Sequence, residues 1–191
     1  MKKKRDCCFG RGIDVLLDET KIILDLCGGT GSWSKPYKDA GYDVRLVTLP
    51  DQDVRVYIPP KNVYGILAAP PCTEFSIAGA WKQVNEDMFL HALSIVDACF
   101  RIILVSRPVF WVVENPVGFL RQYLGKPRWK FCRWEYGDKF SKPTLLWGDF
   151  NIPIRHPIPF ERGDMTDKIR SPVERARTSP CFAQAFFEAN R

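Results

Sequence analysis

The sequence has few of the features expected of a secreted, membrane-embedded or metal-binding protein. No stretch approaches the roughly 20 consecutive apolar residues of a membrane-spanning helix, and none resembles a signal peptide. The cysteines number seven, an odd count for a disulfide framework, and the adjacent Cys7 and Cys8 face no second pair at zinc-ligand spacing. The two histidines, His91 and His156, lie near no recognisable motif, so we expect them to be structural or surface residues. These absences predict an intracellular protein with reduced thiols, no membrane association and no metal.

The composition is that of a basic globular protein. The chain has 191 residues, of which 46% are hydrophobic, enough for one sizeable core. We expect a basic N-terminal segment at 1–20 and a single domain at 21–191. The net charge of +6 favours a polyanionic partner such as nucleic acid. Much of the excess lies at residues 2–5, however, and a solvated basic tail would explain it equally well.

Apolar runs and helical periodicities alternate along the chain. Strands are expected at 21–26, 43–49, 63–69, 110–113, 129–136 and 143–147, and helices at 32–40, 85–106 and 181–189. This alternation predicts an α/β fold with a mostly parallel, doubly wound sheet. Such sheets bind ligands at the carboxyl ends of their strands, so the loops that follow the strands are the candidate sites.

The first of these loops is rich in glycine. Asp25-Leu26 ends an apolar run and leads into Cys27-Gly28-Gly29-Thr30-Gly31. Glycines let the backbone approach a ligand closely, and the following helix aims its amides at that ligand. The same pattern also fits a tight strand-to-helix turn with no ligand.

Two later loops carry groups that could react. Pro70-Pro71 fixes a rigid loop that presents Cys72 directly after a strand. A lone cysteine is more often a small buried hydrophobe than a nucleophile, so its neighbours decide. Glu114 follows another apolar strand. It could also be an ordinary solvated surface residue without a function. A thiol and a carboxyl in one cleft would indicate covalent catalysis paired with proton transfer.

The order of these three loops resembles that of the DNA cytosine-5 methyltransferase family. The nucleophile motif of that family is matched by Pro71-Cys72 with Phe75-Ser76 and Gly79, and its Glu-Asn motif by Glu114-Asn115. Asp25 through Gly31 matches the cofactor loop. The resemblance continues through 136–148, which is similar to the motif that holds the flipped base, and through the terminal helix at 177–190.

The resemblance implies a Rossmann-like fold that uses S-adenosylmethionine, and it implies a role for each matched residue. The implied catalytic residues are Cys72, Glu114 and Asn115. The implied cofactor-binding residues are Asp25, Cys27, Gly28, Gly29, Thr30, Gly31, Ser32, Trp33, Asp51, Asp53 and Pro70. The implied substrate-binding residues are Pro71, Thr73, Phe75, Ser76, Lys142 and Thr144.

The implied reaction is methyl transfer to C5 of cytosine in DNA. Cys72 would add to C6 of the base, and Glu114, with a pKa raised at the end of an apolar strand, would share a proton with N3. Asn115 would position the loop. In duplex DNA the target base would first be flipped out of the stack.

The chain departs from the family pattern in three places. The acid expected at the end of the second strand, for the cofactor ribose, is missing from 48–50; Asp51 is the nearest substitute, and Asp53 could instead face the adenine. A Gln and two Arg of the base-holding motif align with Phe140, Lys142 and Thr144. The insertion at 149–178 is too short for an independent target-recognition domain. The recognised DNA sequence is therefore expected to be short or absent, or specificity is supplied by a separate subunit, as in a restriction-modification system.

Several alternatives stay open at this stage. Arg128, Trp129, Lys130, Arg133 and Trp134 could track a nucleic-acid strand, although a half-buried β-strand explains them as well. The same chemistry could act on RNA or on a free cytosine nucleotide. The chain could also be a non-catalytic subunit of a modification complex, although such a subunit would need neither Cys72 nor Glu114. Its expected location is the cytoplasm or nucleoid, or a host cell if phage-encoded.

Overall fold

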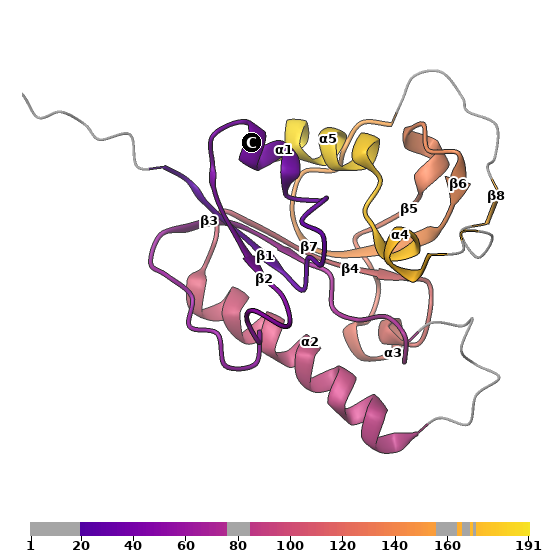
Figure 1. Ribbon diagram of the computed structural model, residues 1–191, viewed down its shortest axis with the longest axis horizontal. Coiled ribbons are helices and arrows are strands. Elements are labelled where there is room, and N and C mark those ends of the chain that lie inside the picture. The colour runs from indigo at the N-terminus through magenta and orange to yellow at the C-terminus, as the bar shows by residue number, and fades with distance from the viewer. Residues whose placement is uncertain (1–19, 76–84, 156–163, 166–168, 170) are drawn as a thin grey trace, which may run out of the picture.

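The structure is a computed structural model that describes residues 20–75, 85–155, 164, 165, 169 and 171–191 (Figure 1). The predicted basic segment at 1–20 lies outside these residues except for Thr20, and so do Ser76 and Gly79.

A six-stranded sheet in the order β2-β1-β3-β4-β7-β5 forms the centre of the fold. Its strands are β1 (Ile22–Leu26), β2 (Asp43–Val47), β3 (Val63–Ala68), β4 (Phe110–Pro116), β5 (Trp129–Cys132) and β7 (Pro143–Asp149). Strands β1 to β4 pair in parallel, whereas β7 runs antiparallel to both β4 and β5. The mostly parallel Rossmann-like α/β class expected from the sequence is therefore confirmed.

Helices cover both faces of the sheet (Figure 1). Helix α2 (Glu86–Ser106) lies on one face, and the short α1 (Lys35–Asp39) and the terminal α5 (Pro180–Ala189) lie on the other. The smaller elements are α3 (Leu120–Leu124), the 3-10 helix η2 (Arg133–Tyr136), α4 (Pro172–Ala176) and a two-stranded sheet of β6 (Phe140–Ser141) and β8 (Asp164–Met165).

The two faces of the sheet are packed differently. On the α5 face the core is aromatic: Phe131 stacks on Phe182 with ring centroids 4.0 Å apart, and Trp33 meets Phe186 at 5.5 Å. The α2 face is aliphatic, with Ile102 of α2 in one buried cluster with Leu24 of β1. Helix α5, last in the chain, thus packs against the segment that directly follows β1.

Helix α2 is long and apolar enough to cross a membrane by length and composition, with a mean hydropathy of 1.9 over its most apolar window. The sequence analysis expected no such segment. A core helix meets the same criteria, and α2 places Ile95, Cys99 and Ile102 in the aliphatic core against the sheet.

Several element boundaries differ from the sequence expectation. The helix expected at 32–40 begins only at Lys35, because Ser34 and the residues before it belong to the turn after β1. The strand expected at 129–136 ends at Cys132 and continues as η2. Strand β4 extends beyond the expected Val113 to Pro116, since β7 pairs with its carboxyl end and matches Glu114 with Leu146. This extension carries the Glu-Asn segment into the sheet.

Gly148 permits the close approach of β7 to β4. Its φ is +144°, and a Cβ atom built on it would lie 2.1 Å from the carbonyl oxygen of Trp111. Gly41 has a φ of +87° but open space around its Cβ position. We predict that Gly148→Ala lowers the free energy of unfolding by about 1–3 kcal/mol more than Gly41→Ala does, because overpacking is added to backbone strain. Urea unfolding of both variants measures the difference, and equal losses would contradict the close approach.

Candidate active site

The glycine turn after β1 is open on its outer side. Gly29 and Gly31 have φ values of +55° and +67°, and the Gly31 amide donates to the Gly28 carbonyl at 3.0 Å. No atom lies within 4 Å of a Cβ position on Gly29, and both Gly29 and Thr30 are exposed. The turn therefore presents backbone and open space, as a phosphate- or nucleoside-binding turn does.

Asp25 supports this turn from behind. Its carboxylate is fully buried and accepts a hydrogen bond from the Ser34 hydroxyl at 2.5 Å. A Cβ atom on Gly28 would lie 2.2 Å from Asp25 Oδ1, so the glycine is needed for the close contact. Burial raises the pKa of Asp25 to about 6, opposed by the hydrogen bonds from Ser34. The structure therefore places this side chain inside the turn.

The next two candidate residues join the turn to the terminal helix. The Thr178 amide donates to Ser32 Oγ at 3.2 Å. The indole of Trp33 is buried between Phe182 and Phe186 of α5. In this structure both side chains hold α5 against the turn, and Trp33 is part of the aromatic core.

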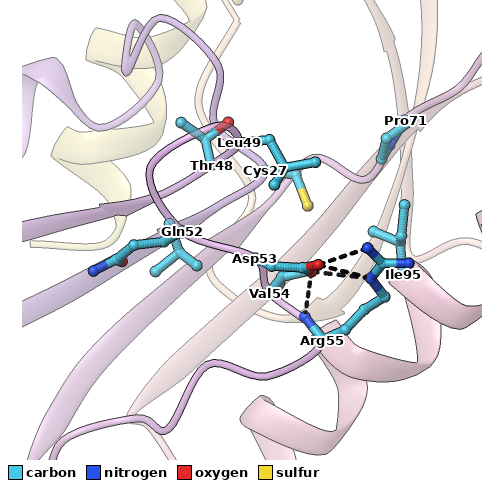
Figure 2. A pocket seen from close by; sticks show the side chains of 10 residues that line it. Cys27, Thr48, Leu49, Gln52, Asp53, Val54, Arg55, Pro71 and Ile95 are labelled. Atoms are coloured by element: carbon cyan, nitrogen blue, oxygen red, sulfur yellow. Dashed lines mark hydrogen bonds and ion pairs between the residues drawn. The ribbon is translucent and has the colours of Figure 1, made fainter.

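A pocket lies beside the turn, between β1, the end of β2 and α2 (Figure 2). Its walls are mainly apolar, with Val47 and Leu49 on one side and Ile95 of α2 and Pro71 among the other lining residues. Cys27 also lines it and packs against the buried cluster that contains Cys99 of α2, whose thiol lowers the Cys27 pKa.

One carboxylate lines this pocket, that of Asp53, which forms an ion pair with Arg55 at 2.6 Å. Hydrogen bonds from the Arg55 side chain and backbone lower the pKa of Asp53 to about 2. Asp53, which the sequence analysis expected to face the adenine, therefore lines the pocket. Asp51, the expected substitute for the missing ribose acid, is exposed and is not among the lining residues.

The cysteine loop is tied to the sheet on both sides. The Ala69 amide donates to the Leu26 carbonyl at 2.9 Å, and the side-chain amide of Asn115 donates to the Pro70 carbonyl at 3.0 Å. Phe75, fully buried, donates its amide to the Cys72 carbonyl, which closes a turn around the cysteine. Thr73 in that turn is exposed. Asn115 thus links the loop that carries Cys72 to the strand that carries Glu114.

Cys72, Glu114 and Lys142 are close enough to influence one another electrostatically. Lys142 Nζ lies 3.9 Å from Glu114 Oε1, and each side chain is 18% exposed. Burial raises the pKa of the Cys72 thiol above its ordinary value; the charge of Lys142 lowers that pKa and the charge of Glu114 raises it. A thiol, a carboxylate and an ammonium group therefore share one edge of the sheet.

Thr144 lies next to this group but serves the backbone. It is buried, and its hydroxyl donates to the Lys142 carbonyl at 3.0 Å. Among the described residues, no cluster of three or more His, Cys, Asp or Glu side chains could hold a metal ion.

The basic and aromatic residues at 128–134 make contacts within the protein. Arg128 lies over the Phe150 ring, and Arg133 forms a nearly buried ion pair with Asp138 at 2.6 Å. The Trp129 ring is covered by Arg155. Contacts within the protein therefore involve Arg128, Trp129 and Arg133, whereas Lys130 is exposed.

Sequence reasoning missed Arg55 and the Lys142–Glu114 pair. Arg55 stands two residues after an aspartate, a spacing too common to single it out. His91, expected to be a structural or surface residue, is exposed and contacts Arg55 from α2.

Comparisons with known proteins agree with this geometry. No protein-family model matches the chain. It is 29% identical over 149 residues to the "Probable DNA (cytosine-5)-methyltransferase" of Frog virus 3 (isolate Goorha), covering 66% of this chain and 70% of that protein. It is 28% identical over 134 residues to the "Type II methyltransferase M.DdeI" of Desulfomicrobium norvegicum, covering 53% of this chain but only 31% of that protein.

A solved structure shares the fold. An E. coli protein described as a "putative DNA modification methyltransferase encoded within prophage" superposes with a TM-score of 0.55 at 16% identity, covering 74% of this chain and 53% of the other. The chain thus spans about half of that protein. The two named relatives are both methyltransferases, in line with the resemblance noted in the sequence, and the solved structure supports the fold.

The buried Asp25 predicts a pH-dependent stability. Because its pKa is raised from 3.8 to about 6, the folded protein keeps a proton that the unfolded chain releases between roughly pH 4 and 6. Stability from this group is therefore highest below pH 4 and falls as pH rises to 6, by on the order of 3 kcal/mol. We expect Asp25→Asn to gain stability relative to wild type across this window, as measured by urea unfolding at pH 4 to 7.

Ser34→Ala is the companion variant for this measurement. It removes a hydrogen bond that lowers the Asp25 pKa, so the decline should extend to higher pH. A difference between Asp25→Asn and wild type that does not change with pH would contradict the buried, ionisable carboxyl.

The charges around Cys72 predict opposite effects of two substitutions. Lys142→Gln should raise the apparent pKa of Cys72 alkylation, since it removes the positive charge, and Glu114→Gln should lower it. The rate of iodoacetamide labelling at Cys72, followed by mass spectrometry from pH 6 to 10, gives that pKa. Labelling of the exposed Cys181 is the internal control. Shifts in the same direction would show that the two groups do not act on Cys72 through their charge.

Proposed function

We propose that this chain, as a member of the cytosine-5 methyltransferase family, transfers a methyl group from S-adenosylmethionine to C5 of cytosine in DNA. The observation that carries the proposal is the continuity of two sites. Pro71 lines the pocket beside the glycine turn, and the next residue is Cys72, which shares its edge of the sheet with Glu114 and Lys142. A methyl donor in the pocket and a base at the thiol would therefore meet across one short loop.

The pocket suits the nucleoside part of the cofactor. Val47, Leu49 and Ile95 offer apolar walls for a purine ring, and the Asp53 carboxylate offers an acceptor for its amino group. The open glycine turn would accommodate the methionine part. The sulfonium of S-adenosylmethionine supplies an electrophilic methyl group when it is bound.

The ribose has no carboxylate partner at the end of β2. Thr48 and Leu49 occupy that position, and both line the pocket. We expect the purine ring and the backbone of the glycine turn to carry most of the cofactor affinity.

Cys72 would act as the nucleophile. Its thiolate adds to C6 of cytosine, and the electron pair moves to C5, which then takes the methyl group. Removal of the C5 proton by a base, with cleavage of the C6–sulfur bond, restores the aromatic ring and the thiolate. Because burial raises the Cys72 pKa, the resting group is a thiol, and the positive charge of Lys142 favours its ionisation.

Glu114 would assist the addition at N3 of the base. A carboxyl hydrogen-bonded to N3 disperses the negative charge that develops in the ring. Lys142 Nζ lies 3.9 Å from Glu114 Oε1, which is longer than a hydrogen bond, so a base would compete with an ion pair and not with a direct hydrogen bond. Lys142 stands where the family has an arginine, and it would contact the base or a phosphate.

The expected partner is DNA, with the target cytosine flipped out of a duplex. Few residues are available for a target-recognition domain, so sequence specificity would be low or would come from a separate subunit. The net charge of +6 supports backbone contacts that read no sequence.

Trapping on fluorinated DNA tests the reaction and its nucleophile together. Fluorine at C5 cannot leave as a proton, so the enzyme should remain covalently joined to DNA containing 5-fluorocytosine. With tritiated S-adenosylmethionine, we expect a denaturant-stable labelled adduct for wild type and Cys181→Ser, and none for Cys72→Ser. Glu114→Gln should slow adduct formation by roughly 100-fold or more, the usual effect of losing an acid-base group.

Parallel reactions on duplex DNA, single-stranded DNA, RNA and dCMP distinguish the candidate substrates. Adducts on RNA or methylation of dCMP alone would replace the DNA assignment with one of those substrates. An adduct that persists in Cys72→Ser would exclude the proposed nucleophile. Tight cofactor binding with no methyl transfer to any of the four would favour a non-catalytic subunit.

A further inference from the structure

The segment that carries Asp53 depends on helix α2 for its position. Residues 51–60 contain no helix or strand. The guanidinium of Arg101, on α2, donates to the carbonyls of Val54, Arg55 and Tyr57 at 3.2, 3.3 and 3.1 Å. His91, nearly three turns earlier on the same helix, contacts the Arg55 side chain at 2.9 Å. The polar wall of the pocket is thus attached to α2 at two points.

Arg55 fixes the orientation of the Asp53 carboxylate. Its backbone amide and Nε donate to Oδ1 at 2.9 and 3.0 Å, and its Nε and Nη2 donate to Oδ2 at 3.0 and 2.6 Å. An ionised carboxylate offers about four acceptor sites. The three N–H groups of Arg55 supply three hydrogens, of which the Nε hydrogen is shared between the two oxygens, so about one acceptor site is left for a ligand. Figure 2 shows both side chains at the wall of the pocket.

His91 in turn fixes Arg55. A guanidinium has no acceptor, so His91 Nε2 must be the acceptor in the contact with Arg55 Nη1. The chain Asp53–Arg55–His91 links the pocket to the outer surface of α2.

We propose that Arg55 is a positioning residue that makes the pocket select a 6-amino purine over a 6-oxo purine. Held by His91, it aims the free acceptor site of Asp53 at the edge of the purine. An anionic carboxylate accepts a hydrogen bond from an amino group and is repelled by a carbonyl oxygen. This inference rests on the proposed function, because it takes the pocket to be the adenine site of the cofactor.

The test compares two ligands that differ only at that edge, S-adenosylhomocysteine and S-inosylhomocysteine. Calorimetric Kd values for the full chain give a selectivity ratio. Wild type should favour the adenosyl ligand by roughly 10- to 100-fold, the range of a hydrogen bond to a charged group. Arg55→Met should reduce the ratio about tenfold, Asp53→Asn should nearly abolish it, and the double variant should resemble Asp53→Asn.

Arg45→Met is the matched control. Arg45 pairs with Asp43 at the same two-residue spacing, with 2.9 Å between Nη2 and Oδ2, but on strand β2 and not among the residues that line the pocket. Its loss should leave the ratio unchanged, whereas Arg55→Lys, which keeps a positive charge, should retain part of it. Thermal unfolding of each variant identifies any that fail to fold, and Arg55→Lys then carries the test.

The outcomes separate the two proposals. A selective wild type whose ratio survives Arg55→Met would overturn the role of Arg55 and leave the proposed function intact. A wild type that binds S-adenosylhomocysteine and S-inosylhomocysteine equally well would also overturn the role of Arg55. A wild type that binds neither ligand and transfers no methyl group would overturn both.

Discussion

The antiparallel pairing of β7 with the carboxyl end of β4 is the interaction on which the site depends. It matches Glu114 with Leu146 and Pro116 with Thr144, and the Val117 amide donates to the Pro143 carbonyl at 3.1 Å. The parallel neighbour β3 pairs with β4 only as far as Val113. Main-chain hydrogen bonds to β7 fix the remaining end of β4, and they bring Lys142, the residue before β7, to the same edge as Glu114. Reactive side chains carried by strands are held more precisely than those on loops.

The same rigidity extends to the thiol through Asn115. This buried side chain donates to the Pro70 carbonyl and so ties the start of the loop that carries Cys72 to β4. The electrostatic balance of the site follows. Burial keeps the thiol protonated at rest, Lys142 opposes that effect, and Glu114 reinforces it. A base that engages the Glu114 carboxyl and lets it hold a proton would remove one of the two effects that disfavour the thiolate. Nucleophile activation would then be coupled to substrate binding.

How much of this could be predicted from the sequence depended on how local each feature is. The glycine turn, the Pro-Pro-Cys loop and the Glu-Asn segment each follow an apolar run, so their places at strand ends could be predicted. The burial of Trp33 could not, because it depends on α5, which lies about 150 residues away in the chain. The inward orientation of Asp25 follows from its contacts with Ser34 and Gly28, which the sequence pattern alone does not specify. Likewise, the length of β4 is decided by a partner strand some 30 residues later, and periodicity within β4 says nothing of it. Lys142 was found by motif alignment, but its pairing with Glu114 is a product of that strand register.

The missing acid at the end of β2 changes how the pocket can discriminate among ligands. A carboxylate there would contact the ribose, a group that all nucleosides share. With Thr48 and Leu49 in its place, the charged group left on the pocket wall to receive a ligand is Asp53, since the Arg55 guanidinium is already engaged by Asp53 and His91. Asp53 stays ionised well below neutral pH because its pKa is lowered to about 2. A permanently ionised, oriented acceptor reads the identity of the base and not the sugar. If the pocket holds the proposed cofactor, its recognition would shift from the ribose to the purine edge. Helix α2, which holds the acceptor through His91 and Arg101, would then support the cofactor site without either residue touching the cofactor.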